Sequence, residues 1–573
     1  MFSLFTLLLW APVLATAGDK TTQIKVGTSE TGEIATFAFK LHKDTTVHVK
    51  SAGLVVPSSM IDGQGTRYYY YGWIIDSSTR KPVWDSRSRS NKNKQWVFEY
   101  DGELTLKKGN YEIYYAAIRD TFNRAVVSKN KYKDRRGKRN NRGIFRKYKS
   151  KLNVTVTAPR GAMNGFATES LIKARLKKVP IALVRAGDDA RMSADFELAK
   201  ETRLRIYALG EAIVRDGDIH DYGWITNADS GEIVWFMGVR AASYAGGTNR
   251  NIQVRKQIVL PAGRYRAHYI TDDSHAYGVW NSMPPDDPFF WGMTIRPVRA
   301  KDPLKVIDKI DDPKPVIAIN KVTGSQNLVR GMELKKKLTL RLLCIGEFPK
   351  SLGEPVDYGW ITNAHSGEIV WSMEKDRVRH AGGRHKNSMV DRHLTLPKGS
   401  YLVHYRSNGA HHYGRFVLGS PHDPERYGIT LWPLHESDRD QIKAFEKDAR
   451  KTPNVLVRIQ KVGNHAYKEA TFELARDARI RIFAMGEGNA KGMADYAWIE
   501  DDRTGHMVWE MKFSKTSHAG GDKMNRLFDG NIGLKRGRYK VLYETDGSHA
   551  YKQWNKRPPD NEERYGVTIY LSE

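Results

Sequence analysis

One motif that occurs four times limits the folds open to this chain more than any other feature. Each copy places two Trp eleven positions apart around a polar turn, and the copies span Tyr71–Asp85, Tyr222–Met237, Tyr358–Met373 and Tyr496–Met511. An apolar run, a short stretch of Asn, Asp, Ser and Gly, and a second apolar run are typical of a β-hairpin. The sequence therefore predicts four β-hairpins.

The position of the turn decides which residues of a hairpin face each other. With the turn centred on Ala228–Gly231, Trp224 is predicted to lie opposite Trp235. The same register places Thr226 opposite Ile233. Aromatic pairs across one face of a sheet contribute up to about 1 kcal/mol each. We therefore expect eight tryptophans to be structural core residues, namely Trp73, Trp84, Trp224, Trp235, Trp360, Trp371, Trp498 and Trp509.

The landmarks around the last three hairpins keep a constant spacing. The first Trp of each hairpin precedes a shared Gly by 68 residues, as Trp224 precedes Gly292. An Ala-Gly-Gly, a Leu-x-x-Gly-x-Tyr and a His-centred loop recur in the same order between them. Apolar and polar residues alternate with period two in stretches such as Asp195–Leu209, which is typical of strands. The repeats are thus domain-sized, and 573 residues are too many for one core.

The predicted fold is all-β, with four tandem antiparallel β-sandwich domains of jelly-roll-like type. Short, partly helical linkers are expected between them. The predicted repeats one to four are residues 18–157, 180–298, 315–433 and 453–573, and the linkers are 158–179, 299–314 and 434–452. Three charged stretches without a strand pattern are candidates for linker helices, namely Ala167–Lys178, Pro303–Ile310 and Glu436–Arg450.

A strong excess of positive charge indicates an anionic partner. The formal net charge is +28, and repeat one carries an insertion, Lys129–Lys151, with twelve Lys or Arg and one Asp. Aromatic residues lie among these charges, a mixture suited to an anionic polymer. A solvated insertion without a ligand is the alternative. The candidate polyanion-binding residues are Lys129, Lys131, Lys133, Arg135, Arg136, Lys138, Arg139, Arg142, Arg146 and Lys147.

The beginning of the chain predicts export. Residues 1–17 combine an apolar core with a small-residue site at Ala15–Ala17, which is typical of a secretory signal peptide. No later run reaches the roughly 18 apolar residues of a membrane span. We therefore expect a periplasmic or extracellular protein. Export favours envelope or extracellular polymers, including anionic glycans, over nucleic acid. Cys344 is the only cysteine, which excludes an intramolecular disulfide, and it is expected to be buried.

Two segments of repeat two carry a resemblance to a known family. Phe196–Glu211, FELAKETRLRIYALGE, and Leu260–Tyr265, LPAGRY, resemble the bacterial pre-peptidase C-terminal (PPC) type of β-sandwich module. The resemblance covers each repeat in outline. It implies modules that are appended to secreted proteins and are not themselves catalytic.

The His-centred loop is the best candidate for a binding site. It reads TDDSHAYGVW from Thr271, SNGAHHYGRF from Ser407 and TDGSHAYKQW from Thr545. Aromatic rings beside His and Asp are suited to stacking on a sugar and bonding its hydroxyls. The alternative is that the aromatic rings plug the end of the sandwich and the His holds the loop. The candidate ligand-binding residues are Asp272, His275, Tyr277, Trp280, His411, Tyr413, Asp546, His549, Tyr551 and Trp554.

Metal binding and catalysis have weaker support. Asp272, Asp273 and His275 offer ligand atoms, but repeat three has Asn and Gly in place of the two Asp, so no ligand set recurs in all three loops. Ser274 beside His275 is the nearest approach to a nucleophile and base, and repeat three has Ala410 there. We therefore predict no catalytic residue, no metal and no cofactor.

These patterns together predict an exported, non-enzymatic binding protein. It would engage envelope or extracellular material, including anionic glycan, through the repeated loops and the basic insertion. Two alternatives stay open. One is a structural or assembly protein of the cell envelope, and the other is a secreted hydrolase or an accessory subunit of one.

Overall fold

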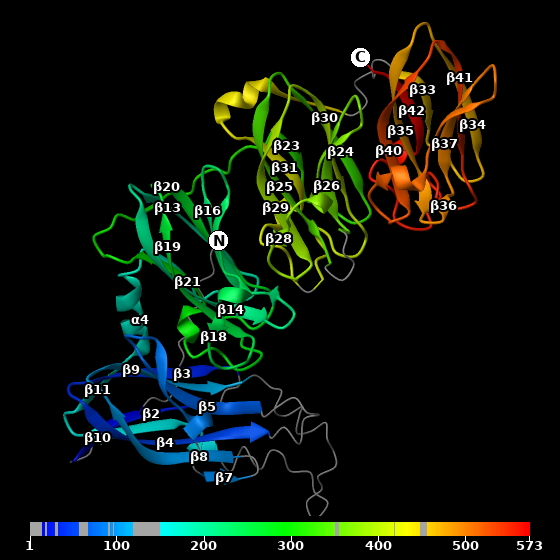
Figure 1. The fold of residues 1–573 in the computed structure, drawn as a ribbon. Helices are drawn as coiled ribbons and strands as arrows, with labels where there is room; N and C mark the ends of the chain where they lie inside the picture. The colour runs from blue at the N-terminus through cyan, green and yellow to red at the C-terminus, as the bar shows by residue number, and fades with distance from the viewer. Residues whose placement is uncertain are drawn as a thin grey trace, which may run out of the picture.

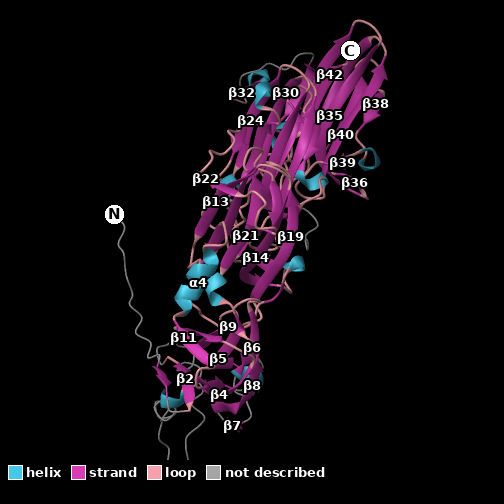
Figure 2. Ribbon diagram, turned by 90° about the vertical axis from the view of Figure 1, so that its left-hand side faces the viewer, coloured by secondary structure: helices cyan, strands magenta, loops and turns pink. Residues whose placement is uncertain are grey.

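The computed structural model describes residues 14–17, 20–28, 32–56, 67–89, 92–94, 97–118, 149–349, 355–417, 419–446 and 455–572. The all-β prediction is confirmed, because strands in antiparallel sheets make up most of this part of the chain. The repeats follow one another from the blue to the red end of the ribbon (Figure 1), and the molecule is elongated (Figure 2). Among these residues no helix has the length and apolar character needed to span a membrane.

Repeat two is built from two antiparallel sheets. The first has the order β12–β21–β14–β19–β18, with β15 attached to β14, and the second has the order β17–β16–β20–β13–β22. The first sheet consists of β12 (Ile181–Val184), β14 (Thr202–Ile213), β15 (Asp218–Ile219), β18 (Ser243–Tyr244), β19 (Asn251–Leu260) and β21 (Gly292–Pro297). The second consists of β13 (Arg191–Leu198), β16 (Tyr222–Asn227), β17 (Ile233–Phe236), β20 (Gly263–Ile270) and β22 (Lys305–Ile307).

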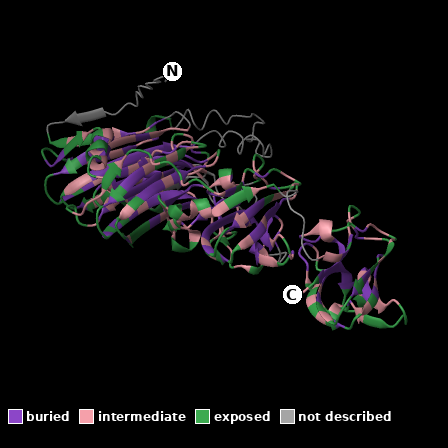
Figure 3. Ribbon diagram, turned by 90° about the horizontal axis from the view of Figure 1, so that it is seen from above, coloured by how far each residue is buried: buried purple, intermediate pink, exposed green. Residues whose placement is uncertain are grey.

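Apolar side chains from both sheets meet in one buried cluster. Ile206 and Ile295 come from the first sheet, while Phe196, Ile225 and Ala267 come from the second. Alternate residues of each strand point inward, so period-two alternation places an apolar face on each sheet. The repeat is therefore a β-sandwich, and buried segments run through the interior of each repeat (Figure 3).

Repeats three and four keep the strand order of repeat two, but no described strand of repeat three corresponds to β15 and none of repeat four corresponds to β22. In repeat three the sheets are β23 (Ile317–Ile319), β31 (Gly428–Pro433), β25 (Leu338–Glu347), β29 (Asn387–Leu396) and β28 (Arg379–His380), and β27 (Ile369–Ser372), β26 (Tyr358–Asn363), β30 (Gly399–Arg406), β24 (Asn327–Leu334) and β32 (Ile442–Phe445). In repeat four they are β33 (Val455–Gln460), β42 (Gly566–Leu571), β35 (Ala478–Asn489), β40 (Asn525–Leu534), β39 (Ser517–His518) and β36 (Gly492–Met493), and β34 (Tyr467–Leu474), β41 (Gly537–Glu544), β37 (Tyr496–Asp501) and β38 (Met507–Glu510).

Repeat one differs, because its described strands are joined in a single eleven-stranded sheet. Strand β4 pairs with β10 and β8 and, at its far end, also with β5, which links the two halves. The strands are β1 (Leu14–Ala17), β2 (Thr21–Val26), β3 (Ile34–Leu41), β4 (Thr45–Val56), β5 (Arg67–Asp76), β6 (Lys81–Asp85), β7 (Lys92–Lys94), β8 (Val97–Leu106), β9 (Gly109–Ala117), β10 (Val154–Pro159) and β11 (Met163–Phe166). The end of the predicted signal peptide, β1, pairs with β2, and residues 1–13 lie outside the described part.

The expected linker helices are confirmed only in part. The first segment forms α4 (Thr168–Leu176). The second, a candidate for a linker helix, forms a strand instead, because Lys305–Ile307 is β22 and pairs with β13. The third begins with a 3-10 helix, η7 (Glu436–Gln441), and then forms β32, which pairs with β24. In both corrected cases the segment pairs with the otherwise free edge of a sheet, which satisfies the backbone groups of that edge.

The remaining described helices are short. They are α1 (Ser86–Arg89), η2 (Lys149–Lys151), η3 (Val239–Ala241), η4 (Pro288–Phe290), η5 (Met373–Lys375), η6 (Pro424–Arg426), η9 (Phe513–Lys515) and η10 (Glu562–Arg564).

The four hairpins form, but the predicted register is wrong beyond the first pair next to the turn. Thr226 lies opposite Ile233 as predicted, whereas Trp224 lies opposite Phe236 and Ile225 opposite Trp235. A β-bulge inserts one extra residue into the second strand of each hairpin and shifts the pairing. Because neighbouring positions on a strand point to opposite faces, the two Trp of a hairpin do not share a face.

The two tryptophans of a hairpin therefore have different surroundings. The second Trp packs with the interior of its own sandwich, as Trp371 does in repeat three. The first lies on the outer face of the sheet, and in repeat one its indole, on Trp73, donates a hydrogen bond of 2.8 Å to the carbonyl of Asp286 in repeat two. Six of the eight are buried, namely Trp73, Trp84, Trp224, Trp360, Trp371 and Trp498, while Trp235 and Trp509 are half-buried and pack against the cores.

Candidate functional site

The His-centred loop is held by two asparagines. His275 follows β20, and its Nε2 lies 2.7 Å from Oδ1 of Asn251, while its Nδ1 lies 2.9 Å from the side-chain amide of Asn281. The amide of Asn251 donates to the carbonyls of Gly246 and Met283, so its oxygen is free to accept from the imidazole. The His therefore ties the loop to the Ala-Gly-Gly turn.

The contact of the His with the first Asn recurs in the other two loops, while in repeat three Nδ1 of His411 accepts a hydrogen bond of 3.1 Å from the backbone amide of Val417 instead of contacting a second Asn. His411 contacts Asn387, and His549 contacts Asn525 and Asn555. The turn that each asparagine holds needs glycine, because Gly246 and Gly247 and their counterparts adopt positive φ.

The structure places the predicted ligand-binding residues at different depths. His275 is 1% exposed, and its ring meets Trp280 edge-on, with ring centroids 5.2 Å apart. Buried members are His275, Trp280, His411 and His549, half-buried members are Asp272, Tyr277, Tyr413, Tyr551 and Trp554, and Asp546 is exposed. The His nitrogens are already hydrogen-bonded inside the loop, which favours the packing alternative for the His residues. A ligand at the half-buried tyrosines stays a prediction.

Burial keeps these histidines neutral and makes the fold sensitive to acid. Burial lowers the pKa of His275 to about 4, against 6.5 in an unfolded chain. Below pH 6.5 the unfolded chain binds a proton that the folded chain does not. The free energy of unfolding thus falls by up to about 1.4 kcal/mol per pH unit as pH drops from 6.5 to about 4.

Thermal unfolding between pH 4 and pH 7 tests this expectation. His275→Gln, which cannot titrate, should show a flatter dependence of the melting temperature on pH than the wild type. The exposed His365 offers a control, since His365→Gln should leave the slope unchanged. Equal slopes for His275→Gln and the wild type would contradict the assignment.

A cluster of carboxyl groups lies beneath the same loop. Oxygen atoms of Glu211 on β14, Asp221 just before β16 and Asp272 just after β20 lie within 4.8 Å of one another. The residue before Glu211 must be glycine for the chain segments to approach this closely, since a Cβ on Gly210 would lie 1.9 Å from the carbonyl oxygen of Asp221. The Gly-Glu pair and the Asp before Tyr-Gly-Trp are thus parts of one site.

Sequence reasoning singled out Asp272 but missed Glu211 and Asp221. A signal was present, because the Gly-Glu pair recurs at 346–347 and 486–487, and an Asp stands three residues before the first Trp in repeats two to four. Without the fold, nothing in the sequence brings these two positions together with the loop.

Burial makes these carboxyl groups hard to ionise. It raises the pKa of Glu211 to about 7, with the nearby Asp272 carboxylate adding to the effect. Burial also raises the pKa of Asp221 well above its usual value. One oxygen of Asp221 accepts a hydrogen bond of 2.9 Å from the indole of Trp291, which orients the carboxyl group.

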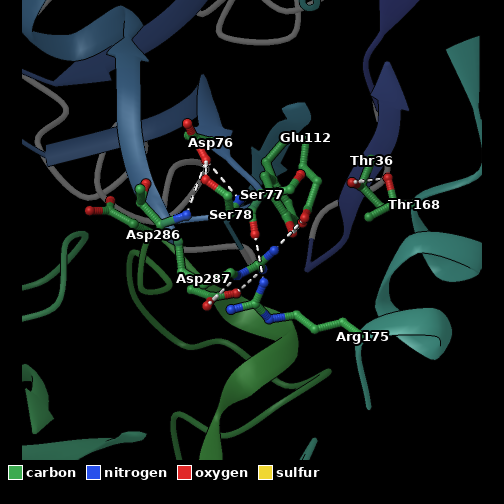
Figure 4. A network of polar contacts seen from close by, with 12 residues as sticks. Thr36, Asp76, Ser77, Ser78, Glu112, Thr168, Arg175, Asp286 and Asp287 are labelled. Carbon is green, nitrogen blue, oxygen red and sulfur yellow. Dashed lines mark hydrogen bonds and ion pairs between the residues drawn. The ribbon is translucent and has the colours of Figure 1, made fainter. Parts of the chain in front are cut away.

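A second recurring arrangement joins the repeats. Arg80 at the hairpin turn of repeat one is buried between Glu112 of the same repeat and Asp287 of repeat two, and it pairs with both. Figure 4 shows Glu112 and Asp287 at this contact, together with Arg175, which donates to the carbonyl of Ser77 at 2.9 Å.

The equivalent Pro-containing loops of repeats three and four also contact the preceding repeat. His422 of repeat three lies edge-on to Trp224 of repeat two, with centroids 5.5 Å apart. Asp560 of repeat four accepts a hydrogen bond from the Tyr358 hydroxyl of repeat three. Each repeat from two to four thus places its Pro-containing loop on the outer Trp face of the repeat before it.

The predicted polyanion-binding residues, Lys129 to Lys147, lie outside the described part of the chain. The insertion is described only at its end, where Lys149 and Lys151 are exposed on η2. The polyanion role stays a prediction. Cys344 is buried as expected, and burial raises the pKa of its thiol.

No protein-family model matches the chain, and no curated protein matches it either.

Proposed function

We propose that the chain is an exported, non-enzymatic binding protein that engages anionic polymer of the cell envelope or the extracellular space. The observation that carries the proposal is the excess of 28 positive charges, much of it gathered in Lys129–Lys151. Such a field attracts anionic polymers at long range and weakens as salt is added.

The contacts between repeats support a role for the rest of the chain as a stiff support. A buried ion pair joins repeats one and two, and in the next junction the guanidinium of Arg341 in repeat three donates to the carbonyls of Ser230 and Gly231 in repeat two. Contacts of this kind restrict the freedom of each repeat relative to its neighbour. Binding groups on a restricted chain lose less conformational entropy when they bind a polymer together.

Neutralising the basic insertion should weaken binding to anionic polymer. In the test variant, the ten predicted Lys and Arg between residues 129 and 147 become Gln. We expect at least about tenfold weaker binding to a sulfated polysaccharide such as heparin at low salt, and a flatter dependence on salt. Affinity chromatography and calorimetry over a salt series measure both effects.

A charge-matched control separates location from net charge. In the control, ten exposed Lys or Arg in repeats two to four become Gln, and it should bind more tightly than the test variant. Equal binding by both variants, or binding of the test variant like the wild type, would contradict the proposal. Retention on native envelope fractions then tells whether the polymer belongs to the envelope.

A structural or assembly role is the second candidate. The docking of a loop on the Trp face of the preceding repeat, at three successive junctions, favours it. It predicts particles that scatter X-rays as a stiff rod and show no salt-dependent affinity for heparin.

A further inference from the structure

Repeat four contains a carboxylate cluster that differs from its counterparts. Oxygen atoms of Glu487 on β35, Asp495 just before β37 and Asp546 just after β41 lie within 4.8 Å of one another. The three residues occupy the same positions as the cluster of repeat two. They come from three separate parts of the repeat, so the fold as a whole holds them together.

One oxygen of the cluster is buried without a partner. Glu487 is 7% exposed, and its Oε2 has no hydrogen-bond partner among the described residues. A buried carboxylate without compensation is costly. Burial raises the pKa of Glu487 to about 7, with the Asp495 and Asp546 carboxylates adding to it and the Lys556 ammonium opposing it.

The corresponding Oε2 atoms of Glu211 in repeat two and Glu347 in repeat three also have no partner, but the Oε1 of each of these side chains has a cation, as repeat three shows. There Nζ of Lys386 lies 2.6 Å from Oε1 of Glu347, and Asn408 takes the place of the third carboxylate. Repeat two also supplies a cation, since Nη1 of Arg250 lies 3.1 Å from Oε1 of Glu211.

Repeat four has Met524 at the position where repeats two and three have these cations. The backbone confirms that the positions correspond. The amide of Gly488 donates to the carbonyl of Met524 at 2.9 Å, as the amide of Phe348 donates to the carbonyl of Lys386 at 2.8 Å. The cluster of repeat four thus has one carboxylate more than that of repeat three and has no cation at the position of Arg250 and Lys386.

We propose that Glu487, Asp495 and Asp546 bind a divalent cation of the calcium class. Three carboxylates offer only oxygen atoms, which hard cations prefer, and water can complete the coordination. Asp546 is exposed, which gives an ion and its water access to the site. Calcium accepts irregular oxygen geometry, whereas magnesium needs a near-ideal octahedron.

Neighbouring groups orient the carboxylates. One oxygen of Asp495 accepts from the amide of Asp546 at 2.8 Å, and the other accepts from the Tyr565 hydroxyl at 2.6 Å. Each oxygen keeps lone-pair capacity for a metal ion. Hydrogen bonds of this kind fix the orientation of metal ligands.

Calcium titration of the full-length protein, after removal of metals with EDTA, tests the proposal. Calorimetry should show one calcium ion bound per chain, with a Kd of about 0.1–1 mM as in extracellular modules. Calcium should also raise the melting temperature, because only the folded chain assembles the site.

Two substitutions in repeat four make the test specific. Glu487→Gln removes one carboxylate, and Met524→Lys supplies the cation that repeat three carries. Both should lose calcium binding and the calcium-dependent rise in melting temperature, yet unfold in EDTA at or above the wild-type temperature. Glu347→Gln, the same change in repeat three, should still bind one ion.

The results that would overturn the proposal are equally clear. They are no calcium binding by the wild type up to about 5 mM, binding retained by Glu487→Gln or by Met524→Lys, or binding lost in Glu347→Gln. The heparin measurements above do not depend on this site, so the two proposals can fail separately.

Discussion

Replacing Arg80 by Met is expected to lower the free energy of unfolding of the first two repeats by about 3–5 kcal/mol. The side chains of Arg80, Glu112 and Asp287 are at most 2% exposed. Without the guanidinium, the two buried carboxylates would lose the cation that is paired with both of them. Because the group joins repeats one and two, repeat one should also unfold in a separate step at lower temperature. Differential scanning calorimetry measures both effects.

A triple variant distinguishes charge from shape at this contact. Arg80→Met combined with Glu112→Gln and Asp287→Asn removes the uncompensated charges and should recover much of the lost stability. The ion pair of Lys107 and Asp44 on the surface of repeat one is a control, because Lys107→Ala should leave the melting temperature unchanged. A melting curve of Arg80→Met that matches the wild type would contradict the role of this ion group.

Replacing Trp291 by Ala is expected to cost about 3–5 kcal/mol of stability in repeat two. Trp291 is fully buried, its indole donates to Asp221, and its ring meets His275 and Trp280 edge-on. The substitution would leave a cavity under the His-centred loop and remove the donor to a buried carboxyl group.

The chain itself supplies the matched control for this change. Repeats three and four have Tyr427 and Tyr565 at this position, and each hydroxyl donates to the corresponding Asp, at 2.7 and 2.6 Å. Trp291→Tyr should therefore keep the hydrogen bond and most of the packing, and lose much less stability than Trp291→Ala. Chemical denaturation followed by fluorescence compares the two. Equal losses would show that the hydrogen-bonded ring has no special role.

The sequence predicted the β-sandwich repeats because alternating apolar residues and turn residues are local signals. The bulge in each hairpin has no such signal, since the spacing of Trp224 and Trp235 is the same with or without it. Pro82, on the second strand of the hairpin in repeat one, was the one hint of a bulge, because prolines in strands often mark bulges or edges. The register could therefore be predicted only next to the turn.

The candidate sites depended on contacts that no local pattern reveals. Arg80 and Asp287 are 207 positions apart, and both are of residue types that are normally exposed. Each carboxylate cluster joins residues on or next to three different strands, and the pairing of those strands had to be known first. The His-centred loop, in contrast, could be identified from its constant length. The sequence did not decide whether the loop binds a ligand or packs against the end of the sandwich.

The loop-on-Trp junction gives the array a direction. A repeat from the middle of the chain carries the loop at one end and the Trp face at the other, so it receives the loop of the following repeat on one side and places its own loop on the preceding repeat on the other. Repeat one has the Trp face but lacks the Ala-Gly-Gly and the His-centred loop, so it can only receive. All three junctions therefore bring the same two faces together in the same order, although the side chains in contact differ from one junction to the next.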